Sequence, residues 1–244
     1  MQSTIKEPAV VLRLAGRKSD LFTRYEMPMK RIFFSAFFVM ACLVSVLAQT
    51  DQKGKSILAA VSKKYGAYTT LKISFSYYID NPQANIKQTV TGVLYTQPKT
   101  NKYYISMKDQ DMISDGKNQW TYLKADKEVQ LNDVDVSSKS MNPAKIFTIY
   151  EKGFKYLYTG DVKEGGKLYH VVDLTPIDPK QSFFKVRLTI DRQTKLIKRA
   201  LIFDKNGSRY TYTITSFTPN PKVPASFFTF DAAKHPGVEV VDLR

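Results

Sequence analysis

The chain has 244 residues, with 37 lysines and arginines against 22 aspartates and glutamates, and a formal net charge of +15. Hydrophobic residues make up 43% of the sequence, which excludes a largely disordered chain. The single cysteine excludes an internal disulfide framework and a zinc site with two or more cysteine ligands. The 15 tyrosines and 15 phenylalanines favour β-strands.

The N-terminal region has the features of an export signal. Residues Ile32–Val46 carry no charge, follow Lys30 and Arg31, and end just before the small residue Ala48. A basic start, a short apolar run and a small-residue cleavage site are typical of a secretory signal peptide, whereas a spanning helix needs about 20 apolar residues. We predict a signal peptide over residues 29–48, cleaved after Ala48, with an uncleaved anchor as the alternative.

Two further features precede the mature chain. Residues 1–28 resemble neither a core nor a linker, so we interpret them as an upstream extension from a start codon assigned too early, with Met29 as the true beginning. Cys42 follows Val39-Met40-Ala41, which faintly resembles a lipoprotein box. The chain stays apolar beyond Cys42, which favours an ordinary cysteine of the signal peptide over a lipid-modified one.

The mature chain opens with a predicted helix over Asp51–Tyr65. Its apolar residues recur at helical spacing and its lysines lie opposite, as expected for one buried face. Gly66 is predicted to end the helix as its C′ residue. The apolar residues of the predicted face are Ile57, Leu58, Val61 and Tyr65.

Strands are predicted for most of the remaining chain. Leu71–Tyr77 alternates strictly between apolar and polar residues, the period of a half-buried strand. Asp111–Tyr122 is a predicted hairpin turning at Asp115-Gly116, and Glu128–Val134 a weak edge strand. A short second helix is predicted from Asn142-Pro143 to Tyr150. The other predicted strands are Thr89–Gln97, Tyr103–Met107, Lys155–Thr159, Lys167–Leu174, Phe184–Ile190, Lys195–Phe203 and Ser208–Phe217.

This order of elements predicts a mainly β (α+β) fold with one domain over residues 49–244. About ten alternating strands and two helical segments favour a single, strongly curved antiparallel sheet, with the helices covering its open side. A barrel of about this strand number can enclose one ligand. A core filled by side chains is the alternative, and composition does not separate the two.

The sequence shows no convincing catalytic or metal-binding constellation. His170 lies in a predicted strand and His235 in a loop, neither within a recognisable catalytic motif. Asp133 and Asp135 are interpreted as solvated edge charges. We therefore expect no catalytic residue, metal or cofactor. The basic charge favours anionic lipid or acidic partners; an exported chain without a recognition motif is not expected to bind nucleic acid.

One motif resembles that of a known family. The segment Met112–Tyr122, MISDGKNQWTY, is similar to the central signature of the outer-membrane lipoprotein carrier (LolA) family, in which a hydrophobic pair precedes S-D-G-K and W-x-Y. Gly92–Tyr95 before a proline also fits the family order. Phe228–Phe230 and Pro236–Val240 resemble the family's F-x-F…P-x-G-V-x-V ending, so that the resemblance spans residues 51–243.

The resemblance implies an incomplete β-barrel with a helical lid over a hydrophobic cavity. Such proteins are periplasmic carriers of Gram-negative cells that bind acylated lipoproteins without a cofactor. Their partners are the inner-membrane lipoprotein-releasing ABC transporter and an outer-membrane acceptor or the outer membrane itself; we expect a monomer. The expected lipid-binding residues are Phe75, Tyr77, Ile113, Trp120 and Tyr122, with Ile146 and Phe147 on the lid.

One position departs from the family pattern. Family members often carry an arginine that latches the lid immediately before the proline ending the second strand, and this chain has Gln97 there. The departure leaves a lipid-binding sensor or an outer-membrane acceptor of the same fold as an alternative. A secreted hydrolase, with a polar cluster around His170 and Asp173, is the alternative from another class.

Overall fold

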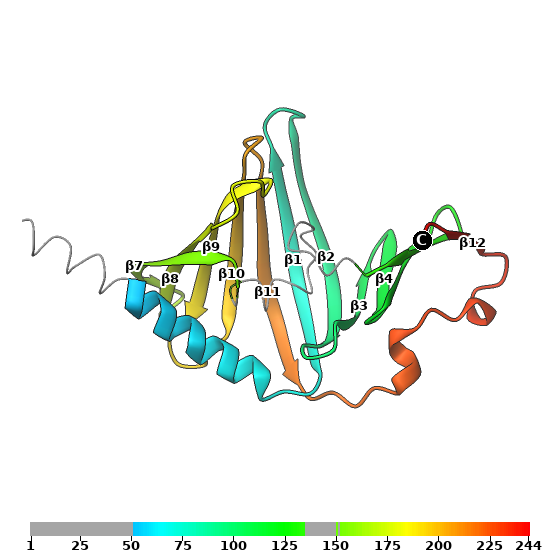
Figure 1. Ribbon diagram of the computed structural model, residues 1–244, viewed down its shortest axis with the longest axis horizontal. Helices are drawn as coiled ribbons and strands as arrows, with labels where there is room; N and C mark the ends of the chain where they lie inside the picture. Colours follow the sequence, from blue (N-terminus) through cyan, green and yellow to red (C-terminus); the bar gives the residue numbers. More distant parts are fainter. Residues whose placement is uncertain (1–50, 135–149, 151) are drawn as a thin grey trace, which may run out of the picture. The chain divides into compact units, whose positions relative to one another are not determined.

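The computed structural model describes residues 51–134, 150 and 152–244, all within one compact unit, Ser45–Arg244. A helix covers residues 51–66, and two short 3-10 helices, η3 (Ala225–Phe228) and η4 (Ala232–Lys234), lie near the C-terminus (Figure 1). The strands are β1 (Leu71–Asn81), β2 (Ile86–Gln97), β3 (Lys102–Met107), β4 (Gln110–Asp115), β5 (Asn118–Leu123), β6 (Glu128–Asp133), β7 (Phe154–Glu164), β8 (Lys167–Pro176), β9 (Phe183–Asp191), β10 (Ile197–Asp204), β11 (Arg209–Pro219) and β12 (Glu239–Asp242).

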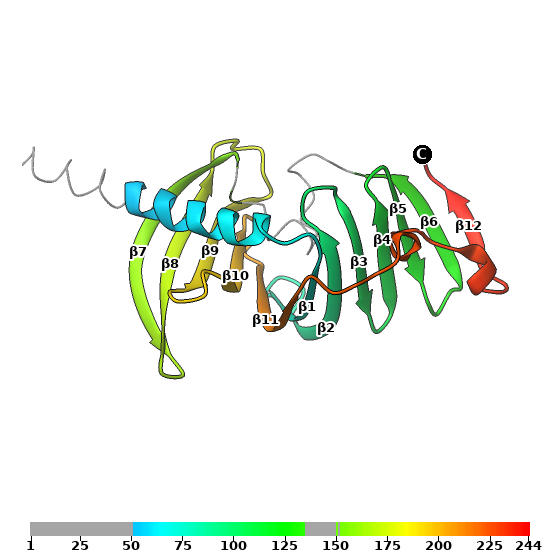
Figure 2. The same cartoon turned by 90° about the horizontal axis from the view of Figure 1, so that it is seen from below.

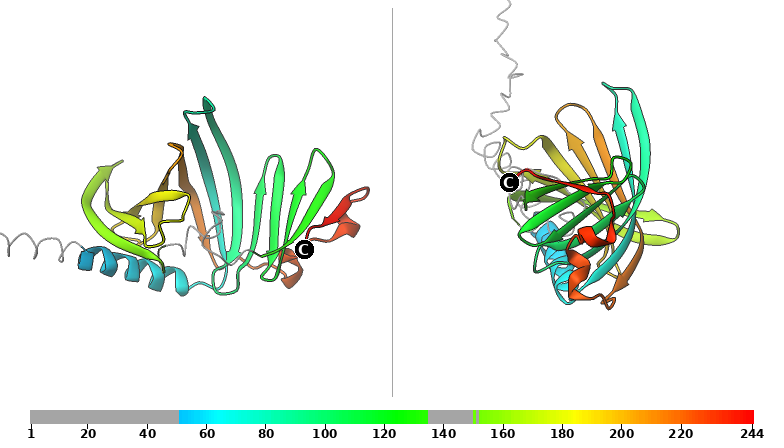
Figure 3. Two further views of the ribbon diagram at one scale, coloured as in Figure 1. Left: turned by 45° about the horizontal axis from the view of Figure 1, so that its top comes forward. Right: turned by 90° about the vertical axis from the view of Figure 1, so that its right-hand side faces the viewer.

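The twelve strands form one curled sheet, which Figure 3 shows from two further sides. Their order is β12-β6-β5-β4-β3-β2-β1-β11-β10-β9-β8-β7. β12 and β7 are the two edges, so the sheet is unclosed. All neighbouring strands are antiparallel except β12, which runs parallel to β6. The predicted mainly β fold with one curved, antiparallel sheet is therefore confirmed.

The prediction of β6 as an edge strand was wrong. β6 lies between β5 and β12, because the segment after β11 returns along the sheet and adds β12 outside it. β12 has only four residues and was not predicted as a strand. The predicted extension over residues 1–28, the signal peptide over 29–48, Cys42 and most of the second helix lie outside the described residues.

The N-terminal helix buries the predicted face. Ile57, Leu58, Val61 and Tyr65 are each at most 8% exposed. Tyr65 also fixes the helix end, because its hydroxyl accepts a hydrogen bond from the Ile197 N–H at 3.1 Å. Gly66 was predicted as a C′ residue, but it belongs to the helix and lacks a positive φ. That prediction was wrong.

The predicted turn at Asp115-Gly116 is confirmed. Gly116 has a φ of +97°, and a Cβ atom there would lie 2.6 Å from the Thr100 carbonyl oxygen. The Asp115 carboxylate accepts hydrogen bonds from the backbone N–H groups of Lys117 and Asn118 at 2.8 and 2.7 Å. Partial burial acts to raise the pKa of Asp115, but these hydrogen bonds outweigh it and lower the pKa.

The sheet has two distinct faces. We call the face that carries the helix the inner face, since the helix packs there against β7, β8 and β11 (Figure 2). A Cβ on Gly54 would lie 3.4 Å from the Tyr156 Cβ and 3.6 Å from Val172. The Tyr65 ring meets Phe217 edge-on, with centroids 5.9 Å apart. One hydrophobic cluster on this face joins the helix to strands from both halves of the sheet.

The other face, which we call the outer face, is covered in part by the C-terminal segment, residues 220–238. The Phe227 ring lies edge-on to Tyr95 and Tyr104, with centroids 4.8 and 5.1 Å apart. Phe228 is only 1% exposed. The segment thus forms a second, smaller aromatic core over β2, β3 and neighbouring strands.

Substituting Gly92 by alanine is expected to destabilise the protein by about 2 kcal/mol, because overpacking forces its neighbours to move. A Cβ there would lie 2.6 Å from Phe75 Cζ and 2.9 Å from the Ser106 carbonyl oxygen. Gly66→Ala is the matched control, since nothing lies within 4 Å of its Cβ position; we expect no loss of stability. Urea unfolding of both variants measures the difference, and equal midpoints would contradict the prediction.

Candidate functional site

The inner face is a continuous surface of aliphatic and aromatic side chains from β7 to β4. Residues paired across neighbouring strands share a face, so the strand register assigns each side chain. The pairing gives two rows across this surface. One row is Tyr77, Tyr212, Ala200, Leu188, Val172 and Tyr158, and the other is Ile73, Leu94, Ile105 and Met112.

Tyrosine rings add aromatic surface to the inner face, and the tyrosine side chains themselves carry no charge. The Tyr77 ring stacks on Tyr212 with centroids 4.4 Å apart, and on Tyr210 at 6.1 Å. Burial raises the pKa of the Tyr77, Tyr103 and Tyr212 hydroxyls above the ordinary value. The hydroxyls therefore stay neutral at physiological pH, and the face is suited to apolar groups.

The five expected lipid-binding residues within the described part of the chain do not share a face. Phe75, at 5% exposed, and Tyr77 lie on the inner face. Trp120 pairs with Ile113, and Ile113 pairs with Tyr104, so these residues lie on the outer face. The prediction that all five residues line one inner face was wrong. Met112 and Ile113 are adjacent, so β4 has an apolar residue on each side and its sequence does not show which of the two faces inward.

Tyr122 belongs to the second core. Its ring contacts Phe230 and His235, with centroids 6.0 and 4.9 Å apart. His235 stacks on Phe230 at 4.9 Å and 17°. The W-x-Y part of the motif thus lies on the face that the C-terminal segment covers, which the motif alone does not reveal.

The expected lid residues Ile146 and Phe147 lie outside the described residues. Tyr150, from the same predicted helix, is 2% exposed, and its carbonyl oxygen accepts a hydrogen bond from the Tyr156 hydroxyl at 2.8 Å. Gln97, at the expected latch position, accepts a hydrogen bond from the Thr100 hydroxyl at 3.2 Å through its side-chain oxygen. That bond lies within the turn between β2 and β3.

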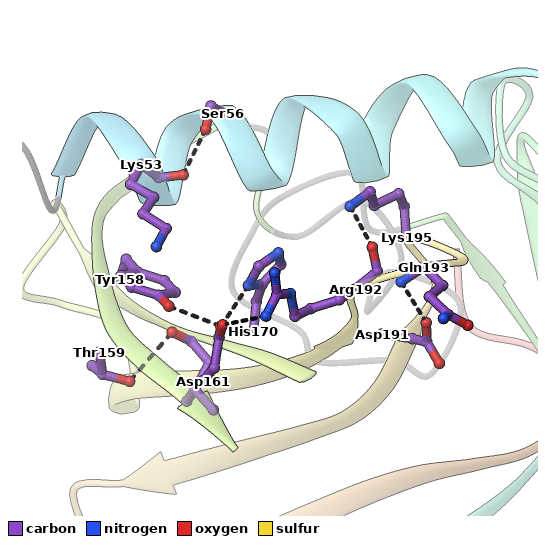
Figure 4. A network of polar contacts seen from close by, with 11 residues as sticks. Lys53, Ser56, Tyr158, Thr159, Asp161, His170, Asp191, Arg192, Gln193 and Lys195 are labelled. Carbon is purple, nitrogen blue, oxygen red and sulfur yellow. Dashed lines mark hydrogen bonds and ion pairs between the residues drawn. The ribbon is translucent and has the colours of Figure 1, made fainter. Parts of the chain in front are cut away.

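A polar network lies beside the helix at the β7 edge of the inner face (Figure 4). Asp161 Oδ1 lies 2.6 Å from His170 Nδ1 and accepts a hydrogen bond from the Tyr158 hydroxyl at 2.8 Å. Arg192 donates to the other carboxylate oxygen at 3.0 Å. Lys53, from the helix, lies 3.9 Å from the centroid of the Tyr158 ring. The network ties β7 to β8 and to the turn after β9.

The suggested cluster of His170 with Asp173 was wrong. Residues three apart on a strand point to opposite faces. Asp173 instead accepts hydrogen bonds from Arg187 at 2.7 and 2.8 Å on the outer face. Across the residues that the structure describes, no group of three histidines, cysteines, aspartates or glutamates could hold a metal ion. The same residues include no helix that is both long and apolar enough to cross a membrane.

Asp161→Asn is expected to destabilise the protein at neutral pH by about 1 kcal/mol, the size usual for a partly exposed ion pair. The pKa of Asp161 lies below the ordinary 3.8. Partial burial by itself would raise this pKa, but the hydrogen bonds with His170 and Tyr158 lower it by more. The stabilisation is therefore present above about pH 4 and lost as the pH falls through the lowered pKa.

Urea unfolding of wild type and Asp161→Asn at pH 7 and pH 3 measures this dependence. The difference between the two proteins should shrink at pH 3. Asp126→Asn is the control, since Asp126 lies exposed in the turn between β5 and β6. A difference that is independent of pH would contradict the role of the Asp161 charge.

Sequence reasoning did not nominate several inner-face residues: Met107, Met112, Tyr210, Tyr212, Ile214 and Phe217. The alternation of Tyr210, Tyr212 and Ile214 was visible in the sequence. What the sequence lacked was the pairing of β11 with β1, which brings Tyr212 onto Tyr77 across 135 positions of the chain. Such a contact depends on topology and not on local pattern.

Comparisons with known proteins agree with the fold. The family model described as "Outer membrane lipoprotein carrier protein LolA" matches residues 67–231, more than half of the chain. An outer-membrane lipoprotein carrier protein of Legionella pneumophila (strain Lens) is 24% identical over 220 residues, which cover 87% of this chain and 99% of that protein. The same-named protein of strain Corby is 26% identical over 188 residues, or 74% and 87% of the two chains.

Among solved structures, an uncharacterized conserved protein from Thermus thermophilus has a TM-score of 0.53 at 12% identity. The match covers 78% of this chain and 99% of that protein, and supports the fold alone. The fold, the inner face and the match of the family model over residues 67–231 lead to one assignment. The chain belongs to the outer membrane lipoprotein carrier protein (LolA) family.

Proposed function

We propose that this chain is a carrier that holds the acyl chains of lipoproteins against the inner face and shuttles them from the inner to the outer membrane. The observation that carries the proposal is the aromatic and aliphatic surface of the inner face, which is continuous from β7 to β4 and carries the charged Asp161 network at its β7 edge. Each methylene removed from water contributes about 0.8 kcal/mol, so a long acyl chain needs such a surface to leave a membrane.

The proposed lipid-contacting residues follow the register. Phe75 and Tyr77 keep the role expected for them, and Met107, Met112 and Tyr212 join them on the same face. Ile146 and Phe147 are retained as candidate lid residues and Gln97 as the candidate latch position. Tyr122 acts instead by holding the C-terminal segment through Phe230 and His235, and Ile113 and Trp120 lie on the same outer face.

The cellular setting follows from the same proposal. The protein works in the periplasm of a Gram-negative cell, as a monomer and without a cofactor or metal. It receives acylated lipoproteins from an inner-membrane lipoprotein-releasing ABC transporter and delivers them to an outer-membrane acceptor or to the membrane itself. It is a binding protein and not an enzyme, in keeping with its family.

A release assay tests the proposal. Protein purified from the periplasmic fraction of cells expressing the full chain is added to spheroplasts that synthesise a labelled outer-membrane lipoprotein together with the matching transporter. A soluble one-to-one complex is expected. Lipoprotein that stays in the membrane, with a protein shown to be folded and lipid-binding, would favour the sensor or acceptor of the same fold.

A further inference from the structure

The inner face changes character between β4 and β5. The row Ile73, Leu94, Ile105 and Met112 continues through register pairs to Thr121 on β5 and Gln130 on β6. The neighbouring row runs from Tyr103 through Ser114 to Gln119 and Asn132. We call the half-buried residues Gln119, Thr121, Gln130 and Asn132 the amide strip.

The amide strip is the polar side of β5 and β6, whose apolar residues Trp120, Tyr122, Val129 and Leu131 lie on the outer face. Thr121 and Gln130 directly continue the apolar row that ends at Met112, on the same face of the same sheet. Gln119 and Asn132 continue the neighbouring row through Ser114. The members of the strip are three side-chain amides and a hydroxyl, all neutral. Neutral groups can donate and accept hydrogen bonds beside an apolar surface at a lower desolvation cost than charged groups.

Local contacts orient these groups. Gln119 accepts a hydrogen bond from the Tyr103 hydroxyl, which engages its amide oxygen and leaves its NH2 group as donor. Gln130 donates from Nε2 to Glu128 at 2.9 Å, so its own oxygen is the acceptor it presents. The strip therefore offers donors and acceptors side by side on two strands that lie about 5 Å apart.

This arrangement points to one ligand chemistry. The geometry points to the amide strip as the subsite for the ester and amide groups that join acyl chains to the glyceryl-cysteine end of a lipoprotein, an inference that rests on the proposed carrier function. The acyl chains then run from the strip along the apolar rows toward β1 and β11. Ester carbonyls are neutral acceptors that need donors once they leave water, and the strip supplies them.

The experiment compares two synthetic probes of equal chain length. One is a cysteine peptide carrying a dipalmitoyl glyceryl diester, and the other is its dihexadecyl diether analogue, which lacks the ester carbonyls. Binding of each to the purified full-length protein is measured by displacement of a fluorescent fatty acid. Wild type should prefer the diester by roughly tenfold, the effect of one to two hydrogen bonds.

The double variant Gln119→Leu with Thr121→Val, which removes the side-chain amide donor of Gln119 and the hydroxyl donor of Thr121, should bind both probes equally, with the diether affinity unchanged. The matched control is Thr213→Val with Gln88→Leu. Thr213 is a half-buried strand threonine on the outer face, and Gln88 is exposed near the tip of β2. The control should keep the wild-type preference.

The outcomes separate the inference from the function on which it rests. Equal binding of both probes by wild type, or a preserved preference in the strip variant, would overturn the amide-strip inference while lipid binding stands. Failure of wild type to bind either probe would overturn the proposed function, and the inference with it.

Discussion

Phe228→Ala is expected to lower the free energy of unfolding by about 4 kcal/mol, the largest stability effect among the substitutions considered. Phe228 is 1% exposed, and its ring lies edge-on to Phe227 at 5.5 Å. Phe227 in turn contacts Tyr95 and Tyr104 on the outer face. Removing the buried ring leaves a cavity where η3 meets the sheet, and the segment that positions β12 loses its anchor.

Urea unfolding followed by fluorescence measures this effect. Trp120 is the single tryptophan and lies on β5, on the outer face itself, so its emission reports on this side of the sheet. Phe184→Ala is the control, because Phe184 is 50% exposed on β9; its change should stay below about 1 kcal/mol. A Phe228→Ala variant as stable as the control would show that the second core contributes little.

Cleavage by a protease of low specificity gives an independent readout. Residues 220–238 should be cut faster in Phe228→Ala than in wild type under native conditions, because the segment is held by aromatic contacts and a few backbone hydrogen bonds. Unchanged cleavage within this segment, in a variant that is globally destabilised, would place the lost stability elsewhere in the sheet.

The fold class was predictable because local pattern carries it. Leu71–Tyr77 alternates in the sequence, and in β1 its residues alternate between buried and half-buried from Leu71 to Ser76. The helix over residues 51–66 buries the residues that its periodicity selects. Asp115-Gly116 forms the turn that its residue types favour. Each of these features depends on neighbours within a few positions of the chain.

The features that were mispredicted depend on distant pairing. β12 forms only because the C-terminal segment brings Glu239–Asp242 alongside β6, about 110 positions earlier in the sequence. The same holds for the site. Alternation shows that Met112 and Ile113 point to opposite sides, but either side could have been the inner one. Only the helix on one face and the C-terminal segment on the other decide between them.

The largest expected effect on lipid binding comes from placing a charge on the inner face. Met112→Glu should weaken binding of the diester lipopeptide roughly 100-fold or more, because a carboxylate buried against acyl chains costs several kcal/mol when unpaired. Met112 is half-buried in the inner-face row, at the border of the amide strip. A fluorescent fatty acid displaced by the lipopeptide reports the affinity, and circular dichroism confirms that the variant is folded.

Two comparisons make the result specific. Leu157→Glu places the same charge on an apolar residue that is 42% exposed on the outer face of β7, and should leave lipid binding unchanged. Trp120→Ala should lower stability through the outer face, while the folded fraction still binds lipid with wild-type affinity. The opposite pattern, with lipid binding lost in folded Trp120→Ala and kept in Met112→Glu, would place the acyl chains on the outer face. The C-terminal segment would then be the element that must move for loading.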